Sequence, residues 1–454
     1  MEEKKQINLF GIFCLGLGGA IGSGIFVLLG YGIGYTGRSI FLVTTLGCAF
    51  MLLAYMYNVV MSSMFVFKGG DYGQKAMLFG PTLTGVAAMF TLLSSAGLAM
   101  YANGIVNYMA EIFPGILPYS KVIACLIITL FFASSIKGSK FISILENIMT
   151  IVLLLAIAVF VIFGLPQVKP GYFSNTDGGF FTGGVGGFFA AVAIMGWACQ
   201  GTTMAPVAMS AATKDAKRTI PKGILIVTLS LAVIYGLMSI VAAGVLPLSE
   251  TAGANLSATA HSIFSYPIYV IFILGGAVFA IATSLLGGIA MLRYPMQQLA
   301  EDGWLPAAFR KTTKNGYPWV TQLMFFLLSI TPILFNFSLD AIVSLCMIPN
   351  MLMNIYLNFS CIRLAKKYPE QWSKSIFHKM PMPVFTIMML LGCVADVIVA
   401  YNLFVSMQPK DMLMVIVCIA ICALVAVVRI KMGAVKASDL EEKKKIIVQE
   451  AVNS

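Results

Sequence analysis

The stretch Gly22-Ser23-Gly24-Ile25-Phe26 places backbone amides and carbonyls where they could bind a small charged solute. It lies inside an apolar run from about Leu9 to Tyr35 that is long enough to cross a bilayer. Glycine destabilises a helix interior by about 1 kcal/mol relative to alanine and lets the backbone leave the helical region. A membrane helix opened at mid-depth exposes polar groups that need a protein-lined cavity or a ligand. Close packing of two helices is the alternative use of the glycines in this run, which are Gly16, Gly18, Gly19, Gly22 and Gly24.

A second stretch of the same character lies in the sixth apolar segment. Between Gly196 and Pro206 the sequence combines glycines, small polar residues and a proline. Transporters often repeat such interruptions at corresponding positions of two inverted halves, and a matched pair points to a binding site. We therefore predict a second helix break here, and the matched positions favour a binding site over packing glycines at the first break.

Composition places the chain in a membrane. Its 454 residues are 59% hydrophobic and 10% charged, with a mean hydropathy of +0.92, whereas soluble domains carry about 25% charged residues. The first apolar segment is too long for a cleavable signal, and similar segments follow it. All nine cysteines fall in apolar stretches and the two histidines, His261 and His378, fall in loops. We expect no disulfide framework, no protein-built metal site and no cofactor.

Twelve spans are predicted if each crossing needs about 20 apolar residues. They are 8–36, 38–66, 82–112, 120–137, 141–165, 183–211, 222–246, 268–298, 319–337, 340–364, 383–406 and 411–430. Basic residues concentrate on the cytoplasmic side of membrane proteins. With the N-terminus inside, 25 of the 29 basic residues are cytoplasmic, and the outward ones are Arg38, Lys121, Lys169 and Lys410. The net charge of +11 is therefore a topology signal and does not indicate a nucleic-acid partner.

The spans predict a single transmembrane domain over residues 1–430, followed by a cytoplasmic tail over 431–454. Spans one to five (about 8–165) and six to ten (about 183–364) form two halves of opposite orientation, because each has an odd number of crossings. Spans eleven and twelve (383–430) follow the two halves. The expected fold is an all-α integral membrane protein with a 5+5 inverted repeat and broken first and sixth helices. The tail is expected to be a solvated segment, with a short amphipathic helix on the inner leaflet as the alternative, and the oligomeric state stays open.

Four motifs follow one another along the chain. They are Ile21-Gly22-Ser23-Gly24-Ile25-Phe26; Lys68-Gly69-Gly70-Asp71-Tyr72 with Phe79-Gly80-Pro81; Lys214-Asp215-Ala216-Lys217-Arg218-Thr219-Ile220-Pro221; and Arg293 with Ala300-Glu301-Asp302-Gly303-Trp304-Leu305-Pro306. In these motifs, their order and their membrane side, the chain resembles the amino acid–polyamine–organocation (APC) superfamily of permeases over spans one to ten. The resemblance implies the 5+5 fold with two peripheral spans, here spans eleven and twelve (383–430), transporting amino acids by alternating access. We expect the protein in the plasma membrane.

The resemblance also implies the residues that bind the substrate. The amino acid carboxylate would lie on amides at the first break, where the start of a half-helix also presents the positive end of its dipole. Carbonyls freed at both breaks would accept from the α-ammonium, and Trp197 would close over the substrate unless it is a core or lipid-facing residue. On this basis Ser23→Ala should be mild, whereas Gly24→Leu should fill the cavity. The expected binding set is Ala20, Ile21, Gly22, Ser23, Gly24, Ile25, Leu98, Trp197, Ala198, Cys199, Gln200, Gly201 and Thr202.

Departures from the family pattern concern charge and ions. Thr203 stands near the position where relatives often carry a glutamate, and a cationic substrate would be left unpaired there, which favours a neutral amino acid. Leu153 stands where many relatives carry a lysine, and Leu286-Gly287 where sodium-coupled members carry a hydroxyl pair. These differences predict sodium-independent transport, by exchange or facilitated flux, and they leave proton coupling open.

Acids inside membrane spans are candidates for coupling. Asp396 lies near the middle of span eleven, where it could instead pair within the bundle or at an oligomer contact. Glu146 lies one turn inside span five, where a residue capped or snorkelling at the inner surface is the alternative. Four cytoplasmic residues are candidates for salt bridges of an inner gate, or for solvated loop charges: Asp71, Arg293, Glu301 and Asp302.

Three other functions fit the sequence less well than a neutral amino acid transporter. A cationic amino acid or polyamine permease or antiporter is the second choice. A channel is more distant, because polarity concentrates at two breaks and does not form rings along several spans. An enzyme is disfavoured, since the spans supply no clustered histidines, paired aspartates or Ser/Lys pair at one depth.

Overall fold

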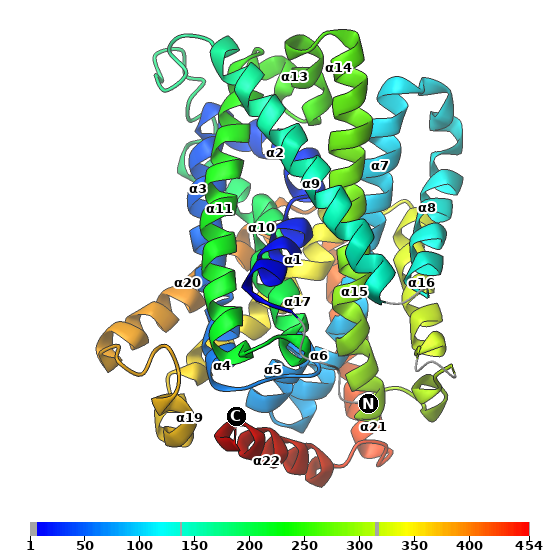
Figure 1. Ribbon diagram of the computed structural model, residues 1–454, viewed down its shortest axis with the longest axis vertical. Coiled ribbons are helices and arrows are strands. Elements are labelled where there is room, and N and C mark those ends of the chain that lie inside the picture. Colours follow the sequence, from blue (N-terminus) through cyan, green and yellow to red (C-terminus); the bar gives the residue numbers. More distant parts are fainter. Residues whose placement is uncertain (1–6, 137–138, 314–316, 454) are drawn as a thin grey trace.

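The computed structural model describes residues 7–136, 139–313 and 317–453, and leaves out the side chains of Ser23, 139–147 and 452–453. Within these residues every regular element is helical, and most helices run along the long axis of one bundle (Figure 1). The helices are α1 (Leu9–Ala20), α2 (Ser23–Thr36), α3 (Ile40–Ala54), α4 (Met56–Met64), α5 (Gly70–Leu78), α6 (Pro81–Leu93), α7 (Leu98–Ile112), α8 (Ser120–Ser135), α9 (Ser139–Gly164), α10 (Gly184–Ala208), α11 (Ala216–Gly244), α12 (Leu248–Thr251), α13 (Leu256–Ile263), α14 (Tyr266–Ile271), α15 (Phe279–Glu301), α16 (Trp319–Leu334), α17 (Leu339–Cys361), α18 (Leu364–Lys367), α19 (Pro369–Ser373), α20 (Met382–Ser406), α21 (Pro409–Lys431) and α22 (Ala437–Asn453).

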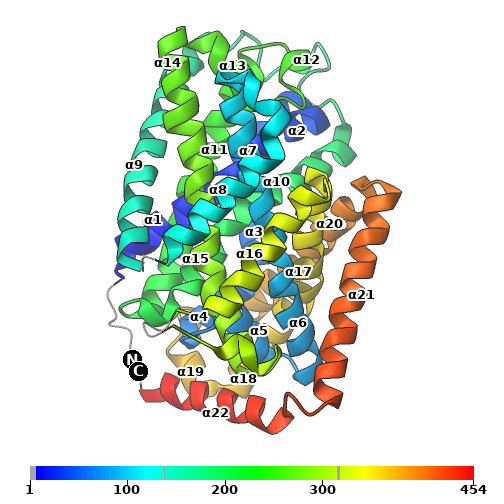
Figure 2. The same cartoon turned by 90° about the vertical axis from the view of Figure 1, so that its right-hand side faces the viewer.

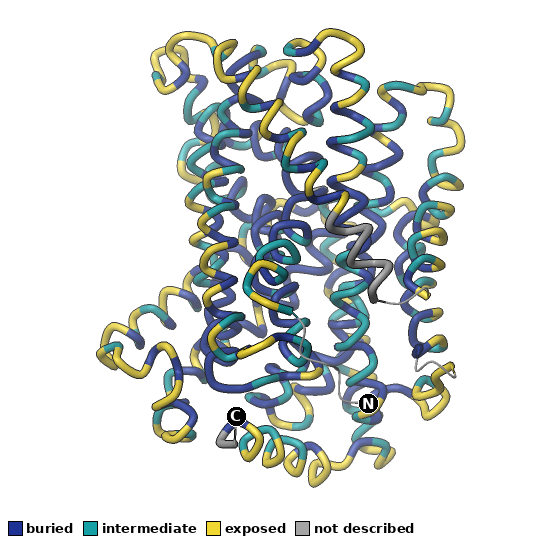
Figure 3. Tube along the Cα trace, viewed as in Figure 1, coloured by how far each residue is buried: buried dark blue, intermediate teal, exposed yellow. Residues whose placement is uncertain are grey.

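The all-α membrane fold expected from hydropathy is confirmed. Ten helical stretches of the described chain are long and apolar enough to cross a membrane, and α1 and α16 are shorter apolar helices. Helices lie within every predicted span, while the number of crossings stays a prediction. Exposed residues gather on the outer surface of the bundle and buried residues along its axis (Figure 3). On α9, for example, Ile151, Leu155 and Ile162 are exposed while Phe160 is buried, as a helix between lipid and a packed core requires.

The first predicted break is present. Helix α1 ends at Ala20 and α2 begins at Ser23, so Ile21 and Gly22 lie between two half-helices. The break lies directly against α15: a Cβ on Gly22 would be 1.9 Å from the Ser284 oxygen and 2.5 Å from its Cβ. Glycine at this position is therefore required by the close approach of α15.

The second predicted break is wrong, because α10 continues without interruption from Gly184 to Ala208. Its small polar residues satisfy themselves within the helix: the Thr202 and Thr203 hydroxyls donate to the carbonyls of Cys199 and Gln200 at 3.0 Å. Pro206, which lacks an N–H, stands in the last turn, two residues before the helix ends. The glycines of α10 therefore do not open the helix.

Gly201 instead serves helix packing. A Cβ there would lie 2.8 Å from the Gly19 carbonyl oxygen and 2.9 Å from the Ala20 Cα. The middle of α10 thus packs closely against the last turn of α1. The glycines of the first segment thus allow a helix break, whereas Gly201 in the sixth segment allows close packing of two helices.

The tail forms helix α22, which lies across one end of the bundle near α5 and α19 (Figures 1 and 2). Lys443 forms a salt bridge with Asp302 at 2.5 Å, and the Lys217 ammonium donates to the Ala451 carbonyl at 3.2 Å. The beginning of the described chain is also at this end, since the Ile7 amide donates to the Ala212 carbonyl at 3.1 Å. The tail is therefore helical and contacts the rest of the protein, while its expected place on the inner leaflet stays a prediction.

Candidate functional site

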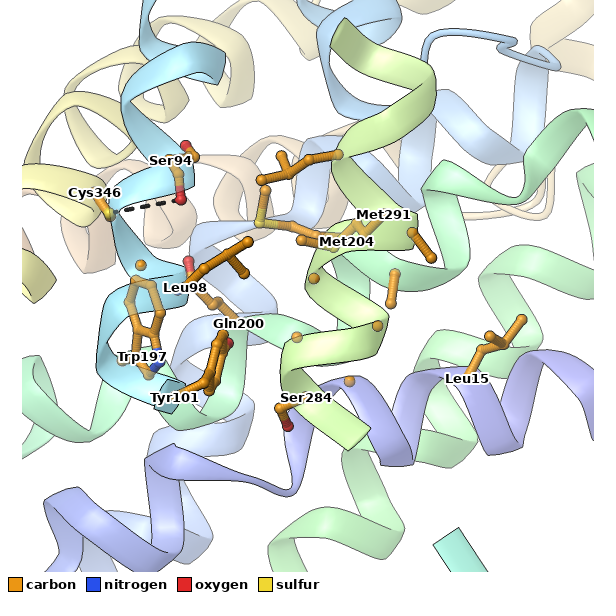
Figure 4. A pocket seen from close by; sticks show the side chains of 18 of the residues that line it. Leu15, Ser94, Leu98, Tyr101, Trp197, Gln200, Met204, Ser284, Met291 and Cys346 are labelled. Carbon is orange, nitrogen blue, oxygen red and sulfur yellow. Dashed lines mark hydrogen bonds between the residues drawn. The ribbon is translucent and has the colours of Figure 1, made fainter. Parts of the chain in front are cut away.

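A cavity of about 80 Å³ lies beside the break between α1 and α2 (Figure 4). A single water needs at least about 10–15 Å³ by this kind of measure, so the cavity has room for a small solute. It is lined by residues of α1, α7, α10, α15, α17 and the turn before α7, namely Leu15, Gly19, Ser94, Gly97, Leu98, Tyr101, Trp197, Gln200, Gly201, Met204, Ala205, Met209, Ser284, Gly287, Gly288, Ala290, Met291, Leu292, Cys346 and Asn350. None of these described lining residues carries a formal charge.

The cavity contains some of the expected binding residues but not all of them. Leu98, Trp197, Gln200 and Gly201 line it. The other members of the set with described side chains are packed in the helix contacts behind its wall, and these are Ala20, Ile21, Gly22, Gly24, Ile25, Ala198, Cys199 and Thr202. The backbone of Ser23 begins α2, whereas its side chain lies outside the described residues.

The start of α2 supplies amide donors. Gly22 occupies the N-cap position of α2 and has no side chain that could accept a hydrogen bond. The Phe26 backbone amide donates to the Gly22 carbonyl at 3.1 Å, which is the first hydrogen bond of the helix. The three amides before it, those of residues 23–25, are the ones that a helix leaves without an internal partner. They also lie at the positive end of the α2 dipole. This end of the break is suited to an anionic group such as a carboxylate.

Gly24, within these three residues, is also a packing residue. A Cβ there would lie 2.3 Å from the Ala198 Cβ and 2.4 Å from its Cα. The sequence suggested that a side chain at Gly24 would fill the cavity. The structure shows instead that it would collide with α10.

The carbonyl side of the break is already partnered by two hydroxyls. The Tyr235 hydroxyl of α11 donates to the Ala20 carbonyl at 2.7 Å. The Ser284 hydroxyl of α15 lies 3.2 Å from the Gly18 carbonyl oxygen and 3.3 Å from that of Ile21. Ala20 and Ile21, expected to accept from an ammonium, thus accept from the protein itself.

The prediction that span eight lacks a hydroxyl pair is wrong. Thr283 and Ser284 are adjacent and buried, and the Thr283 hydroxyl donates to the Ala280 carbonyl at 2.7 Å. They lie three residues before Leu286 and Gly287, about one turn of helix earlier. The hydroxyl residues were visible in the sequence, whereas their contact with the first break was not.

Trp197 lies at the wall of the cavity, beside Tyr101, where Figure 4 shows the two rings next to each other. Their ring centroids are 6.3 Å apart. The indole rests on Gly97, where a Cβ would lie 2.5 Å from the Trp197 Cη2. Trp197 is therefore neither a lipid-facing residue nor a fully buried core residue, and its position is compatible with closing over a solute.

A polar cluster lies on the α5 side of the cavity, around a smaller cavity that shares Ser94, Met204 and Asn350 with the first. The Lys75 ammonium is 2.6 Å from the Asp71 carboxylate and donates to the Asn350 side-chain oxygen at 2.6 Å. Asp71 also accepts from the Tyr57 hydroxyl. Asp71 was predicted from the sequence as a salt-bridge residue. Its partner Lys75, one helical turn later on α5, was not predicted.

The remaining coupling candidates have different surroundings. Arg293 forms no salt bridge among the described residues and lies over the Tyr317 ring, 5.1 Å from its centroid. Leu153 is fully buried in α9, so an apolar side chain occupies the position expected for a lysine. The side chain of Glu146 lies outside the described residues. Asp396 is buried in α20.

A bundle of apolar helices with a solute-sized cavity beside a broken helix is the architecture of a secondary transporter. The chain belongs to the amino acid permease family, whose family model matches residues 7–422. It is similar to the branched-chain amino acid permease BcaP of Bacillus subtilis (strain 168), with 26% identity over 396 residues that cover 81% of this chain and 82% of the relative. It is also similar to the histidine permease HisP of Lactococcus lactis subsp. cremoris (26% identity; 82% of each chain).

The D-serine/D-alanine/glycine transporter of Escherichia coli (strain K12) shares 24% identity over 70% of each chain. The resemblance to the APC permeases is thereby confirmed, and the chain is a multi-pass membrane transporter of the amino acid permease family, not an enzyme.

Proposed function

We propose that this chain transports neutral α-amino acids across the plasma membrane by alternating access, with both termini in the cytoplasm. The observation that carries the proposal is the uncharged cavity beside the amide-rich start of α2. A zwitterion brings one negative and one positive group. The first suits the α2 amides, and the second suits the carbonyls on the other side of the break.

The ammonium would share carbonyls that already have partners. A carbonyl oxygen has two lone pairs, so Ala20 and Ile21 can each accept a second hydrogen bond beside Tyr235 and Ser284. Gly19, which lines the cavity, is the third residue of this turn. In this arrangement the first break holds both ends of the substrate backbone, because the carbonyls of Trp197, Ala198 and Gln200 lie inside the continuous helix α10.

The lack of charged residues in the cavity lining supports a substrate with a neutral side chain. An ammonium or guanidinium in a largely dry pocket without a counter-charge is costly. Among the similar proteins are a branched-chain amino acid permease, a histidine permease and a D-serine/D-alanine/glycine transporter, which agree with this choice. A similar protein of Arabidopsis thaliana is a cationic amino acid transporter, so a cationic substrate is the alternative to be tested.

Counterflow in proteoliposomes tests the substrate class. We expect uptake of a labelled neutral amino acid to be stimulated by unlabelled neutral amino acids inside, and not by lysine, arginine or a polyamine. Gln200→Glu places a carboxylate on the cavity wall with little change in shape, so it should lower neutral uptake and admit cationic substrates. Equal stimulation by lysine in the unsubstituted protein would refute neutral selectivity. Flux without trans-stimulation would indicate a channel.

Sodium independence stays a prediction and now rests on Leu153 alone, because the hydroxyl pair of Thr283 and Ser284 is present. Uptake should be the same when sodium is replaced by potassium or choline at constant osmolarity. A dependence on sodium that Ser284→Ala abolishes would refute the prediction and assign the ion to the oxygens around the first break.

A further inference from the structure

Asp396 is a buried acid that has no counter-ion among the residues whose side chains are described. It lies near the middle of α20 with none of its surface exposed. One carboxyl oxygen, Oδ2, accepts from the Asn358 amide at 2.9 Å, and the other, Oδ1, has no hydrogen-bond partner among the described residues. The helices packed against α20 here are α3, α4, α10 and α17. None of the five contains a lysine, arginine or histidine.

An ionised carboxylate in such surroundings is unfavourable. Burying an unpaired charge costs so much that the group takes up a proton instead. The titratable groups that face Asp396 are the hydroxyls of Tyr55 and Tyr57, from the junction of α3 and α4, and the thiol of Cys393 on α20 itself. None of them supplies a positive charge. The occupant that fits this site is therefore a proton.

Three asparagines on one face of α17 connect Asp396 with the cavity. Asn350, Asn354 and Asn358 recur at every fourth residue and so lie on one side of the helix. Asn350 lines the cavity, Asn358 donates to Asp396, and Asn354 lies between them. The amide of Asn354 is buried and forms no hydrogen bond of normal geometry with a described residue, which is the situation that an ordered water commonly resolves.

A second connection runs through Tyr55. Asn354 lies between the Tyr55 hydroxyl and the Asp396 carboxyl, and the Tyr55 hydroxyl donates to the side-chain oxygen of Gln200 at 2.9 Å. Gln200 lines the cavity (Figure 4). Polar side chains thus extend from the cavity wall to Asp396 through groups that can all donate and accept hydrogen bonds.

The route crosses an interruption between helices. Tyr55 separates α3 from α4. The Asn358 amide donates to the Ala54 carbonyl at 2.9 Å, and its oxygen accepts from the Tyr57 amide at 3.0 Å. The same side chain therefore holds both Asp396 and the ends of the interrupted helix, so a change of charge at Asp396 acts directly on this junction.

We propose that Asp396 is the proton-binding site of a proton-coupled transport cycle, connected to the cavity by Asn354, Tyr55 and Gln200. The inference rests on the proposed amino acid transport and deepens it by naming the coupled ion. The carboxylate takes a proton from hydronium ion when the route is hydrated from one side, forming the neutral acid and water. It returns that proton to water when the cavity opens to the other side.

Proteoliposomes allow two separate measurements on Asp396→Asn, which keeps the shape of the side chain and cannot ionise. Counterflow needs only a substrate gradient and should stay within about twofold of the unsubstituted protein, a difference below 0.5 kcal/mol. Accumulation driven by an inwardly directed proton gradient should be lost. Asp439→Asn, which removes an exposed carboxylate of α22, is the matched control and should change neither measurement.

Infrared difference spectroscopy on the purified protein gives an independent readout. The unsubstituted protein should show the carbonyl stretch of a protonated carboxylic acid, and Asp396→Asn should lack it. Asn354→Ala should retain this band but reduce proton-driven accumulation, because it interrupts the route and leaves the acid in place.

Three results would overturn the proposal. The first is proton-driven accumulation that survives Asp396→Asn. The second is an unsubstituted protein with normal counterflow but no response to a proton gradient, which leaves amino acid transport intact and removes the proton. The third is loss of counterflow together with a lowered melting temperature in Asp396→Asn, which assigns Asp396 to helix packing.

Discussion

Gly24→Ala tests the contact on which the proposed binding site depends. Gly24 lies in the first turn of α2, where a Cβ would be 2.4 Å from the Ala198 Cα, although ordinary contacts begin at 3.4 Å. The neighbour is backbone and cannot rotate away, so α2 and α10 must separate by about 1 Å in a closely packed interior. Overpacking of this kind costs about 1–3 kcal/mol, and alanine returns about 1 kcal/mol of helix propensity. We expect a net loss of about 1–2 kcal/mol in the free energy of unfolding.

Substrate affinity should fall as well. A hydrogen bond to a charged group contributes about 1.5–3 kcal/mol, and a shift of the α2 amides that weakens one such bond would lower affinity about tenfold or more. Binding of a labelled neutral amino acid to the purified protein measures this, and thermal unfolding in detergent measures the stability.

Gly34→Ala is the matched control for Gly24→Ala. Gly34 lies on the same helix, is exposed, and its Cβ would meet nothing closer than Ala252 at 3.9 Å. This variant should be as stable as the unsubstituted protein or more stable, with unchanged binding. Adding Ala198→Gly to Gly24→Ala should restore only part of the loss, because it removes the Ala198 Cβ and leaves its Cα. Normal affinity in Gly24→Ala, or an equal loss in Gly34→Ala, would refute the role of this contact.

Three further substitutions test contacts around the cavity. Lys75→Met should destabilise the protein by about 3–5 kcal/mol, because it leaves the buried Asp71 carboxylate without its cation; adding Asp71→Asn should recover most of the melting temperature, and no recovery would contradict the pairing. Gly97→Ala should raise the KM for uptake, since its Cβ would displace the Trp197 indole; an unchanged KM would argue against a gating role. Ser284→Ala should cost about 1–3 kcal/mol in thermal unfolding by leaving carbonyls of the break without a donor, and an unchanged melting temperature would show that they do not need it.

Hydropathy predicted the helices well because the bilayer imposes a strong constraint on the chain. A segment in hydrocarbon must satisfy its own backbone and be about 20 residues long, so apolar length nearly determines where a helix lies. The first break could be found for a related reason. Gly22 must lack a side chain because α15 approaches it at that point, and the sequence therefore shows glycine there.

Glycine in span six led to the wrong prediction of a second helix break. Gly201 is needed because α10 contacts the backbone of Gly19 and Ala20, and a packing contact produces the same residue as a break. Local composition does not distinguish the two, since the difference lies in what stands opposite. The Thr202 and Thr203 hydroxyls, which looked like ligands, bond to the helix that carries them.

Hydrogen bonds between residues of different helices could not be predicted from the sequence for a similar reason. Tyr235 is 215 residues from Ala20, whose carbonyl it bonds, and Ser284 is 263 residues from Ile21. Spacing along one helix indicates which residues share a face, but it does not indicate the depth at which that face meets another helix. Lys75 is different, because its position one turn after Asp71 on α5 is an ordinary helix pairing and could have been noticed.

The break between α1 and α2 has a consequence for how the proposed substrate would act on the protein. In the proposed site an ammonium is held at the end of α1, where the Ala20 and Ile21 carbonyls accept from Tyr235 and Ser284. A substrate bound in this way would share acceptors with one hydroxyl from α11 and one from α15. Because a cation is the stronger donor, its arrival would weaken both hydroxyl bonds and loosen the first break from these two helices together. Binding at the end of α1 would thus be connected to the packing of the bundle on two sides, which is the kind of differential contact that a ligand needs to shift a conformational equilibrium.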